Sequence, residues 1–197
     1  MLYIMRHGKT DWNAAYRLQG SRDISLNEEG REMARKAAKE YADIPLDICY
    51  VSPLTRAQET AEIFLEGRNI PVIVDDRLRE MCFGEYEGID HIFEKPELNI
   101  YKMFRDPAHY VPDRGAEGFD ELYQRTGEFL EEVIAPDMAA GKNVIIIGHG
   151  AMNSSIISRY RGIPLEHFWD ILCKNCEMLP GVSMGSLTGK DRANEYR

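Results

Sequence analysis

Long apolar runs and cysteines are both scarce in this sequence. No apolar stretch approaches the roughly 18 residues that a membrane-spanning helix requires, and nothing at the N-terminus resembles a signal peptide. Four cysteines in 197 residues are too few for a disulfide framework, so we expect free thiols. These absences predict a soluble, cytoplasmic protein without a membrane partner.

An excess of basic residues is also absent. The chain carries 24 Lys and Arg against 33 Asp and Glu, which gives a net charge of −9. This balance argues against a general basic surface and therefore against a nucleic-acid partner. An acidic protein can still bind phosphate, but only through a local cluster of Arg and His.

Compact carboxylate clusters, internal repeats and low-complexity segments are missing as well. A hard divalent cation prefers several oxygen ligands held close together, so the sequence predicts no metal site. We therefore expect no cofactor and a metal-independent activity.

Short apolar runs alternate with helical patterns along the chain. The runs are rich in branched and aromatic residues and predict buried strands within residues 2–8, 48–51 and 143–147, a short strand at 71–74 and a last strand near 171–178. Apolar residues at helical spacing separate them. In a chain of this length the pattern predicts a single α/β domain over residues 1–197, with helices on both faces of a mainly parallel sheet.

Three segments qualify this simple pattern. Residues 89–115 contain three prolines and no clear periodicity, which predicts a cap-like excursion of loops and short helices. A long helix that starts near residue 119 should end before Pro136. Residues 182–197 are polar and contain Gly and Ser, so we expect a loose C-terminal tail.

Two of the predicted strands end in a histidine followed by a glycine. Arg6-His7-Gly8 ends the first, His149-Gly150 ends the fourth, and each glycine should let the chain turn. Ligands bind at the carboxyl ends of parallel strands, so both histidines should lie at one edge of the sheet. A neutral imidazole is a good nucleophile toward phosphorus, and an arginine offers forked donors to phosphoryl oxygens. The alternative is a pair of structural histidines, because three-residue motifs are weak signals.

Arg56 strengthens the case for an anion pocket. It follows the strand at 48–51, after Ser52 and Pro53, which we expect to be the N-cap and the first residue of a helix. Helix N-termini attract anions, but a basic residue there is poorly placed for helix stability. This local conflict indicates a phosphate ligand rather than an arginine solvated at the surface.

A proton donor is also needed if the substrate is an alkyl phosphate ester. Three glutamates follow the strand at 71–74, namely Glu80, Glu85 and Glu87. Their chemistry alone does not separate them.

Several of these segments, in this order, resemble the motifs of the histidine phosphatase superfamily, the phosphoglycerate-mutase-like group. The resemblance covers residues 2–178 and is carried by residues 6–13, 17–20, 26–30, 52–61, 78–88 and 149–150. It implies a three-layer α/β/α sandwich with a mainly parallel central sheet.

The resemblance also implies roles for individual residues. His7 becomes the phosphorylated nucleophile and Glu80 the proton donor. The implied phosphate ligands are Arg6, Arg56 and His149, and the implied substrate-binding residues are Asn13 and Gln19. Lys9 departs from the family, which usually has an acidic residue there. Residues 114–118 keep Glu117 but lack the hydroxyl that commonly follows it.

The predicted function is hydrolysis of a small phosphorylated metabolite through a phosphohistidine. One alternative is a cofactor-dependent phosphoglycerate mutase that uses the same site. A mutase must shield its phosphoenzyme from water with a closing lid, for which this chain offers only the 89–115 excursion and a short tail. The second alternative is a non-catalytic phosphoester-binding protein. The sequence does not indicate the physiological substrate or the oligomeric state.

Overall fold

The computed structural model describes residues 1–182 and contains one five-stranded sheet in the order β3-β2-β4-β1-β5. Four strands run parallel: β1 (Leu2–Arg6), β2 (Ile48–Val51), β3 (Val72–Val74) and β4 (Val144–Gly148). The edge strand β5 (Met178–Val182) runs antiparallel to β1. The predicted mainly parallel sheet is therefore confirmed. The expected loose tail lies, from residue 183 onward, outside the described residues.

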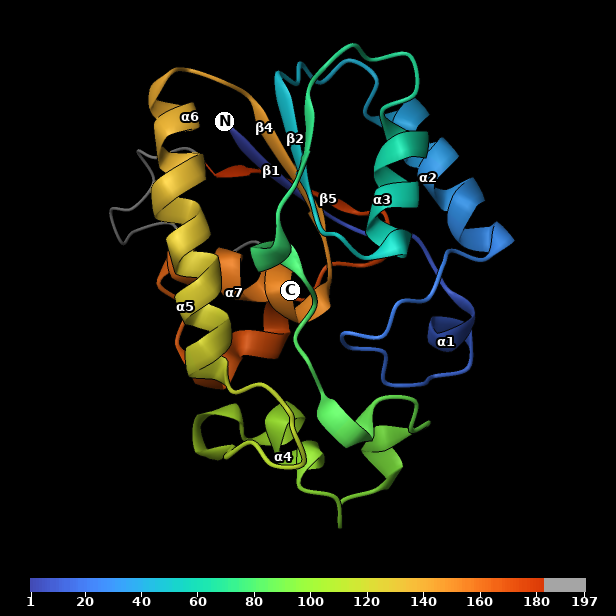
Figure 1. The fold of residues 1–197 in the computed structure, drawn as a ribbon, viewed down its shortest axis with the longest axis vertical. Coiled ribbons are helices and arrows are strands. Elements are labelled where there is room, and N and C mark those ends of the chain that lie inside the picture. The colour runs from blue at the N-terminus through green and yellow to red at the C-terminus, as the bar shows by residue number, and fades with distance from the viewer. Residues whose placement is uncertain (183–197) are drawn as a thin grey trace.

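Helices cover both faces of the sheet (Figure 1). On one face lie α2 (Glu28–Glu40) and α3 (Thr55–Phe64), and on the other lie α5 (Phe119–Phe129) and α7 (Gly150–Arg161). Strand β4 shows why. Ile145 and Ile147 pack in the α2–α3 core and Ile146 in the α5–α7 core, because successive side chains of a strand point to opposite faces. This is the predicted α/β/α sandwich.

The two helices on the α2–α3 face begin differently. Asn27 caps α2 as expected, since its side chain accepts a hydrogen bond from the Gly30 N–H at 2.8 Å. The prediction that Ser52 caps the next helix is wrong. Helix α3 begins at Thr55, and the carboxylate of Asp23, from a distant loop, accepts the Thr55 N–H at 2.7 Å. Ser52 is left for another partner at the site.

Two further boundaries were predicted wrongly. The long helix does not end before Pro136. It continues from α5 through a π-helical turn (Leu130–Ile134) into α6 (Ala135–Ala139), and Pro136 lies in the first turn of α6, where proline is tolerated. The last strand starts at Met178 and not near residue 171, because a 3₁₀ helix (Leu165–Ile171) and an irregular stretch precede it.

The excursion between β3 and α5 lies beyond one end of the sheet, at the bottom of Figure 1. It contains helix α4 (Ile100–Arg105) and short 3₁₀ turns, while the four-residue helix α1 (Asp11–Ala14) lies in another loop. Apolar side chains of the excursion, such as Ile100 and Met103, form a third core with Leu122 of α5 and Ala151 of α7. The excursion therefore packs directly on the start of α7, which follows His149.

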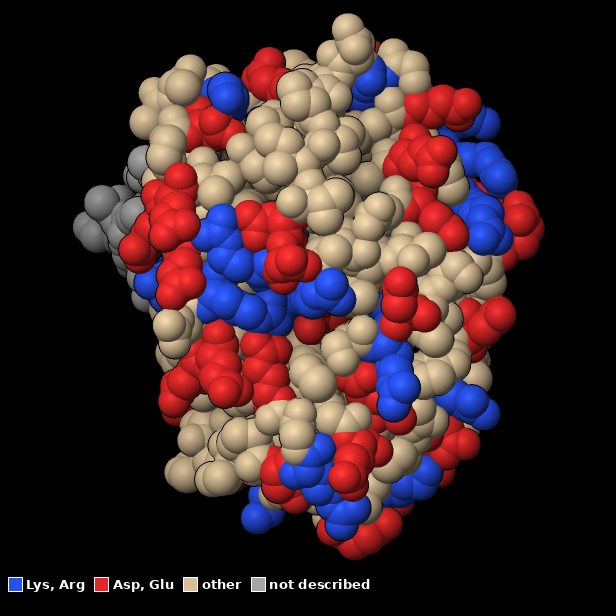
Figure 2. All heavy atoms as spheres, in the orientation of Figure 1, with Lys and Arg blue, Asp and Glu red and all other residues tan. Residues whose placement is uncertain are grey.

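The surface in Figure 2 shows acidic and basic side chains interspersed, with a mostly uncharged area in its upper middle. Basic side chains gather in one small area left of centre, bordered by acidic ones, so no basic surface extends across that face. Within residues 1–182, no helix combines the length and the apolar character needed to cross a membrane.

Candidate active site

The parallel pairing of β1 and β4 brings the two predicted histidines together. Arg6 lies opposite Gly148 in the sheet register, and the His7 N–H donates to the Gly148 carbonyl at 2.9 Å. The rings of His7 and His149 are 5.1 Å apart between centroids, and both side chains are buried. Neighbouring strands that end at one edge thus create a histidine pair from residues 142 positions apart in sequence.

The proton on the His7 ring has a defined place. Nδ1 lies 2.6 Å from the Gly8 carbonyl oxygen, which can only accept, so Nδ1 carries the hydrogen and Nε2 keeps a free lone pair. Burial lowers the pKa of His7 well below its usual value, and the charges of Arg56 and Arg6 lower it further. His7 is therefore neutral at pH 7, as a nucleophilic imidazole must be.

His149 is held in the opposite tautomer. Its Nδ1 accepts from Arg56 Nε at 3.2 Å, which leaves the proton on Nε2 to be donated to Ser52 Oγ at 2.7 Å. Burial lowers the pKa of His149 well below its usual value, followed by the charges of Arg56 and His7. Sequence reasoning missed Ser52 as a site residue. Its place at the end of β2, on the same sheet edge as His7, was the available signal.

Two buried arginines surround the histidines. Arg56 is fully buried and donates to the carbonyls of Gly20 and Arg22, both at 2.7 Å, so a position solvated at the surface is ruled out. Arg6 donates through Nη1 to the Cys173 carbonyl at 3.1 Å, while its buried Nε has no partner. Burial lowers the pKa of Arg6 and lowers that of Arg56 to about 10. Both guanidiniums stay charged at pH 7, and Arg6 has a donor to spare for an anion.

The structure separates the three candidate glutamates. Glu80 lies against the N-terminus of α7, where its carboxylate accepts the N–H groups of Ala151 at 3.2 Å and Met152 at 3.0 Å. Glu87 is buried, but its carboxylate accepts backbone N–H groups of the 21–22 loop and of Phe83. The side chain of Glu85 is 74% exposed. Only Glu80 combines burial with a position beside the histidine edge.

Gly8 and Gly150 lie where the chain leaves β1 and β4, and neither has a positive φ, so their value lies in close packing. A Cβ on Gly8 would lie 2.5 Å from the Gly30 carbonyl oxygen. A Cβ on Gly150 would lie 3.5 Å from Glu80 Oε2 and 3.7 Å from Arg6 Cζ. These two distances are ordinary van der Waals contacts, whereas Leu172 Cδ1 would lie only 3.0 Å from the Cβ, so the bare α-carbon of Gly150 makes room mainly for Leu172.

The similarity to known proteins agrees with this geometry. A family model described as histidine phosphatase superfamily (branch 1) matches residues 2–180. The chain belongs to this superfamily. The predicted class of activity, phosphate-ester hydrolysis by a histidine phosphatase, is confirmed at the level of the family.

Individual relatives cover most of the chain. Phosphoserine phosphatase 1 of Hydrogenobacter thermophilus is 31% identical over 176 residues, which is 88% of this chain and 82% of that protein. A 2,3-bisphosphoglycerate-dependent phosphoglycerate mutase of Gloeobacter violaceus is 32% identical over 155 residues, 76% of this chain and 70% of that protein. The structure of Bacillus stearothermophilus YhfR superimposes with a TM-score of 0.79 at 34% identity, covering 89% of this chain and 86% of that one.

The two implied substrate-binding residues of this histidine phosphatase have structural contacts. Gln19 is buried, and with its amide oxygen facing Arg56 that oxygen accepts from Nη1 at 3.0 Å and shares the single Nε–H, at 2.7 Å, with His149 Nδ1. Asn13 Oδ1 accepts the Thr10 N–H at 3.2 Å in a capping box at the start of α1. Gln19 therefore orients a phosphate-binding candidate and Asn13 shapes the loop. Their contact with substrate stays a prediction.

Lys9, which departs from the family pattern, does not add a free charge to the pocket. Its Nζ forms an ion pair with Glu29 at 2.9 Å on α2. No group of three His, Cys, Asp or Glu side chains within residues 1–182 could hold a metal ion. Independence from metal stays a prediction. All four cysteines are free, as expected.

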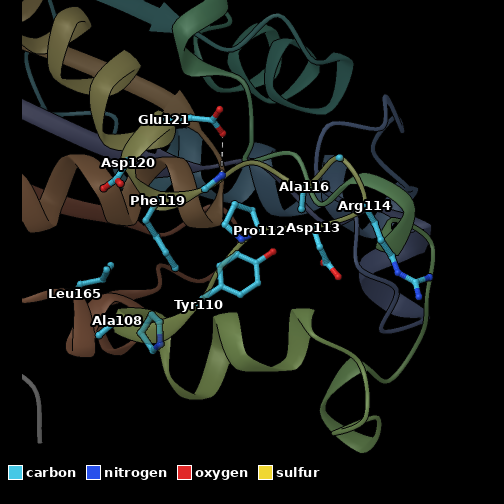
Figure 3. A pocket seen from close by; sticks show the side chains of 13 residues that line it. Ala108, Tyr110, Pro112, Asp113, Arg114, Ala116, Phe119, Asp120, Glu121 and Leu165 are labelled. Carbon is cyan, nitrogen blue, oxygen red and sulfur yellow. Dashed lines mark hydrogen bonds between the residues drawn. The ribbon is translucent and has the colours of Figure 1, made fainter.

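A separate pocket of about 410 Å³ lies between the excursion and the start of α5 (Figure 3). Tyr110, Asp113 and Arg114 line one side of it, and Phe119 and Asp120 line the other. None of the predicted site residues lines this pocket. Its walls mix acidic, basic and aromatic side chains, so they do not single out one ligand chemistry.

Proposed function

We propose that this protein is a phosphomonoesterase that hydrolyses a small phosphorylated metabolite through a phosphohistidine on His7. The observation that carries the proposal is the state of His7. Its ring is buried and neutral, with the proton held on Nδ1 by Gly8 and the Nε2 lone pair free between two arginines. No other histidine of residues 1–182 combines burial with a ring nitrogen that is left unprotonated and free of a hydrogen-bond partner.

In the first half-reaction, Nε2 of His7 attacks phosphorus and the bond to the ester oxygen breaks. Glu80 supplies a proton to the leaving alcohol. In the second, a water attacks the phosphohistidine, Glu80 takes up a proton from that water, and inorganic phosphate leaves with His7 neutral again. Phosphoryl charge lies on three equatorial oxygens, so catalysis consists mainly of positioning and charge stabilisation. We assign that role to Arg6, Arg56 and His149.

The N-terminus of α7 connects these groups. The N–H groups of Ala151 and Met152 that now bind Glu80 are also the natural donors for a phosphoryl oxygen. The arrangement supports an exchange in which a phosphoryl oxygen of the substrate replaces the Glu80 carboxylate at these two N–H groups. The carboxyl is then free to face the leaving oxygen.

The substrate class follows from the relatives only in outline. One relative is named for phosphoserine and another for phosphoglycerate, both of them small phosphorylated carboxylic acids. We propose a substrate of this size, handled in the cytoplasm without a metal, a nucleic acid or a membrane. A non-catalytic binding protein would not need a neutral nucleophile and a nearby carboxyl at one site.

The mutase relative makes phosphoglycerate mutation the second candidate. The test is to supply 3-phosphoglycerate with a trace of 2,3-bisphosphoglycerate and to follow phosphate release and the 2-isomer together. We expect phosphate or no reaction, because the 89–115 excursion offers too little chain for a tight lid that would keep water from the phosphoenzyme. Isomerisation at about 10 s⁻¹ or more without stoichiometric phosphate release would establish the mutase instead. A screen of small phosphate esters, phosphoserine included, then identifies the best substrate by its kcat/KM.

A further inference from the structure

Glu80 lies on a segment that has little regular structure of its own. Only the short 3₁₀ turns at Asp76–Leu78 and Gly84–Tyr86 flank it, and the residues between them are in neither helix nor strand. A carboxyl that must reach a leaving oxygen needs a fixed backbone, because a displacement of 1 Å can cost about 10²-fold in rate. Some other element must therefore hold this segment.

The side chain of Arg125, on α5, holds the segment before Glu80. Its Nη1 donates to the carbonyl of Arg77 at 2.6 Å and to the carbonyl of Arg79 at 2.8 Å. The remaining nitrogens form a two-point ion pair with Glu117, Nε to Oε1 at 2.7 Å and Nη2 to Oε2 at 3.0 Å. A planar guanidinium is suited to four such bonds at fixed angles.

Glu117 holds the segment after Glu80. Its carboxylate accepts the Cys82 N–H at 3.1 Å, and its backbone N–H donates to the Cys82 carbonyl at 2.8 Å. The side chains of Arg125 and Glu117 are only 21% and 14% exposed, so solvent competes weakly for these bonds. The pair therefore forms hydrogen bonds to the backbone on both sides of Glu80 and fixes that segment relative to α5.

We infer that Arg125 and Glu117 are positioning residues for the proton donor of this enzyme. They act by holding the backbone around Glu80, and their hydrogen bonds go to Arg77, Arg79, Cys82 and each other rather than to the histidines or arginines of the site. The charge of Arg125 also contributes to the lowered pKa of His149, and Arg125→Lys keeps that charge. The inference rests on the proposed function, since it assumes that Glu80 protonates the leaving oxygen. It predicts that damage to the pair slows only those reactions that need the proton.

The test measures kcat and KM of Arg125→Met with an alkyl phosphate and with p-nitrophenyl phosphate, whose leaving group departs unprotonated. We expect about a 10-fold loss of kcat for the alkyl ester, less than about a 3-fold loss for the aryl ester, and little change in KM. Glu117→Gln, which keeps the shape of the side chain, should show the same selectivity more weakly. Arg125→Lys keeps the charge but not the four-bond geometry, so it should resemble Arg125→Met.

Arg159→Met is the matched control. Arg159, on α7, also bonds to a neighbouring helix, through the Tyr123 carbonyl of α5 and the side chain of Glu131, but makes no bond to the segment around Glu80. It should leave the ratio of the two rates unchanged. In a Glu80→Gln background, Arg125→Met should add less than about a 2-fold loss for the alkyl ester, because both changes remove the same step.

Equal losses with both esters, or additive losses in the double variant, would overturn the inference. If Arg125→Met does not fold, the same two ratios for Glu117→Gln decide. The proposed function fails separately. If Glu80→Gln itself slows both esters equally, Glu80 is not the proton donor. If Glu80→Gln slows mainly the alkyl ester but Arg125→Met slows both esters equally, only the positioning role of Arg125 and Glu117 is lost.

Discussion

The site has two walls that are built in different ways. The first wall consists of residues at strand ends or helix starts, namely Arg6, His7, Ser52, Arg56 and His149. Regular hydrogen bonding fixes their backbones, in helix α3 for Arg56 and at the edge of the sheet for the others, as the register of β1 against β4 shows. The second wall is Glu80, on an irregular segment held by the N-terminus of α7 and by the Arg125–Glu117 pair.

The difference separates two tasks of a phosphatase. The first wall offers fixed positive charge and a neutral nucleophile, which every phosphate ester requires. The second offers Glu80, the proposed proton donor, whose contribution depends on the leaving group. Substitutions in the first wall should therefore act on all substrates alike, whereas substitutions in the second should depend on the ester.

The largest effect is expected for His7→Ala. Removing the nucleophile should lower turnover by roughly 10⁴-fold or more for alkyl and aryl esters alike, and no label from a ³²P-substrate should be trapped on the protein. The measurement is labelling of the wild type and the variant with a quench in alkaline detergent, because the P–N bond of phosphohistidine breaks in acid. Turnover near the wild-type rate would remove the phosphohistidine mechanism.

Glu80→Gln should be the next most damaging change, and only for esters that need protonation. We expect a loss of kcat on the order of 10²–10⁴-fold with an alkyl phosphate and a much smaller loss with p-nitrophenyl phosphate. Glu85→Gln, on the surface, is the control and should affect neither. A uniform loss would place Glu80 with the first wall.

Ser52→Ala should have a moderate effect that is the same for both esters. The change leaves the buried Nε2–H of His149 without its partner, which costs about 1–3 kcal/mol, so kcat/KM should fall roughly 5- to 150-fold. Ser154→Ala on α7 is the control, because the Ser154 hydroxyl is buried with no partner to lose. An unchanged kcat/KM in Ser52→Ala would show that His149 needs no support from Ser52.

The smallest expected effect concerns how the free energy of unfolding changes with pH. The pKa values of His7 and His149 are lowered in the folded state. Below about pH 6.5 these two histidines therefore bind protons in the unfolded chain but not in the folded chain. Stability should therefore fall as pH drops below 6.5, by up to about 1.4 kcal/mol per pH unit for each histidine. Urea unfolding between pH 7.5 and 5.5 measures this slope.

Two variants check the origin of that slope. His7→Asn should flatten it, because one of the two protons is no longer taken up on unfolding. His109→Gln should steepen it slightly, since Asp106 raises the pKa of His109 and this exposed pair stabilises the fold at low pH. A slope unaffected by His7→Asn would contradict a buried neutral His7.

The first wall was largely predictable because it follows from local pattern. A short apolar run that ends in a polar residue is a buried strand with its chemistry at the sheet edge, and parallel strands share that edge. Arg6, His7 and His149 could therefore be grouped without a structure. The start of α3 could not be predicted, because a carboxylate from the distant residue Asp23 replaces the cap that Ser52 seemed to provide.

The second wall could not be worked out from pattern at all. Glu80, Glu85 and Glu87 lie within eight residues and have the same chemistry, and only the resemblance to a family favoured Glu80. The alternation of strands and helices and the histidines at the strand ends follow from residues that are neighbours in the sequence. The acidic balance follows from composition alone. Tertiary structure alone decided which carboxyl meets α7, which tautomer each histidine holds and what anchors the proton donor. Those depend on contacts such as Glu80 with Met152 and Arg125 with Arg77, whose partners lie 72 and 48 residues apart.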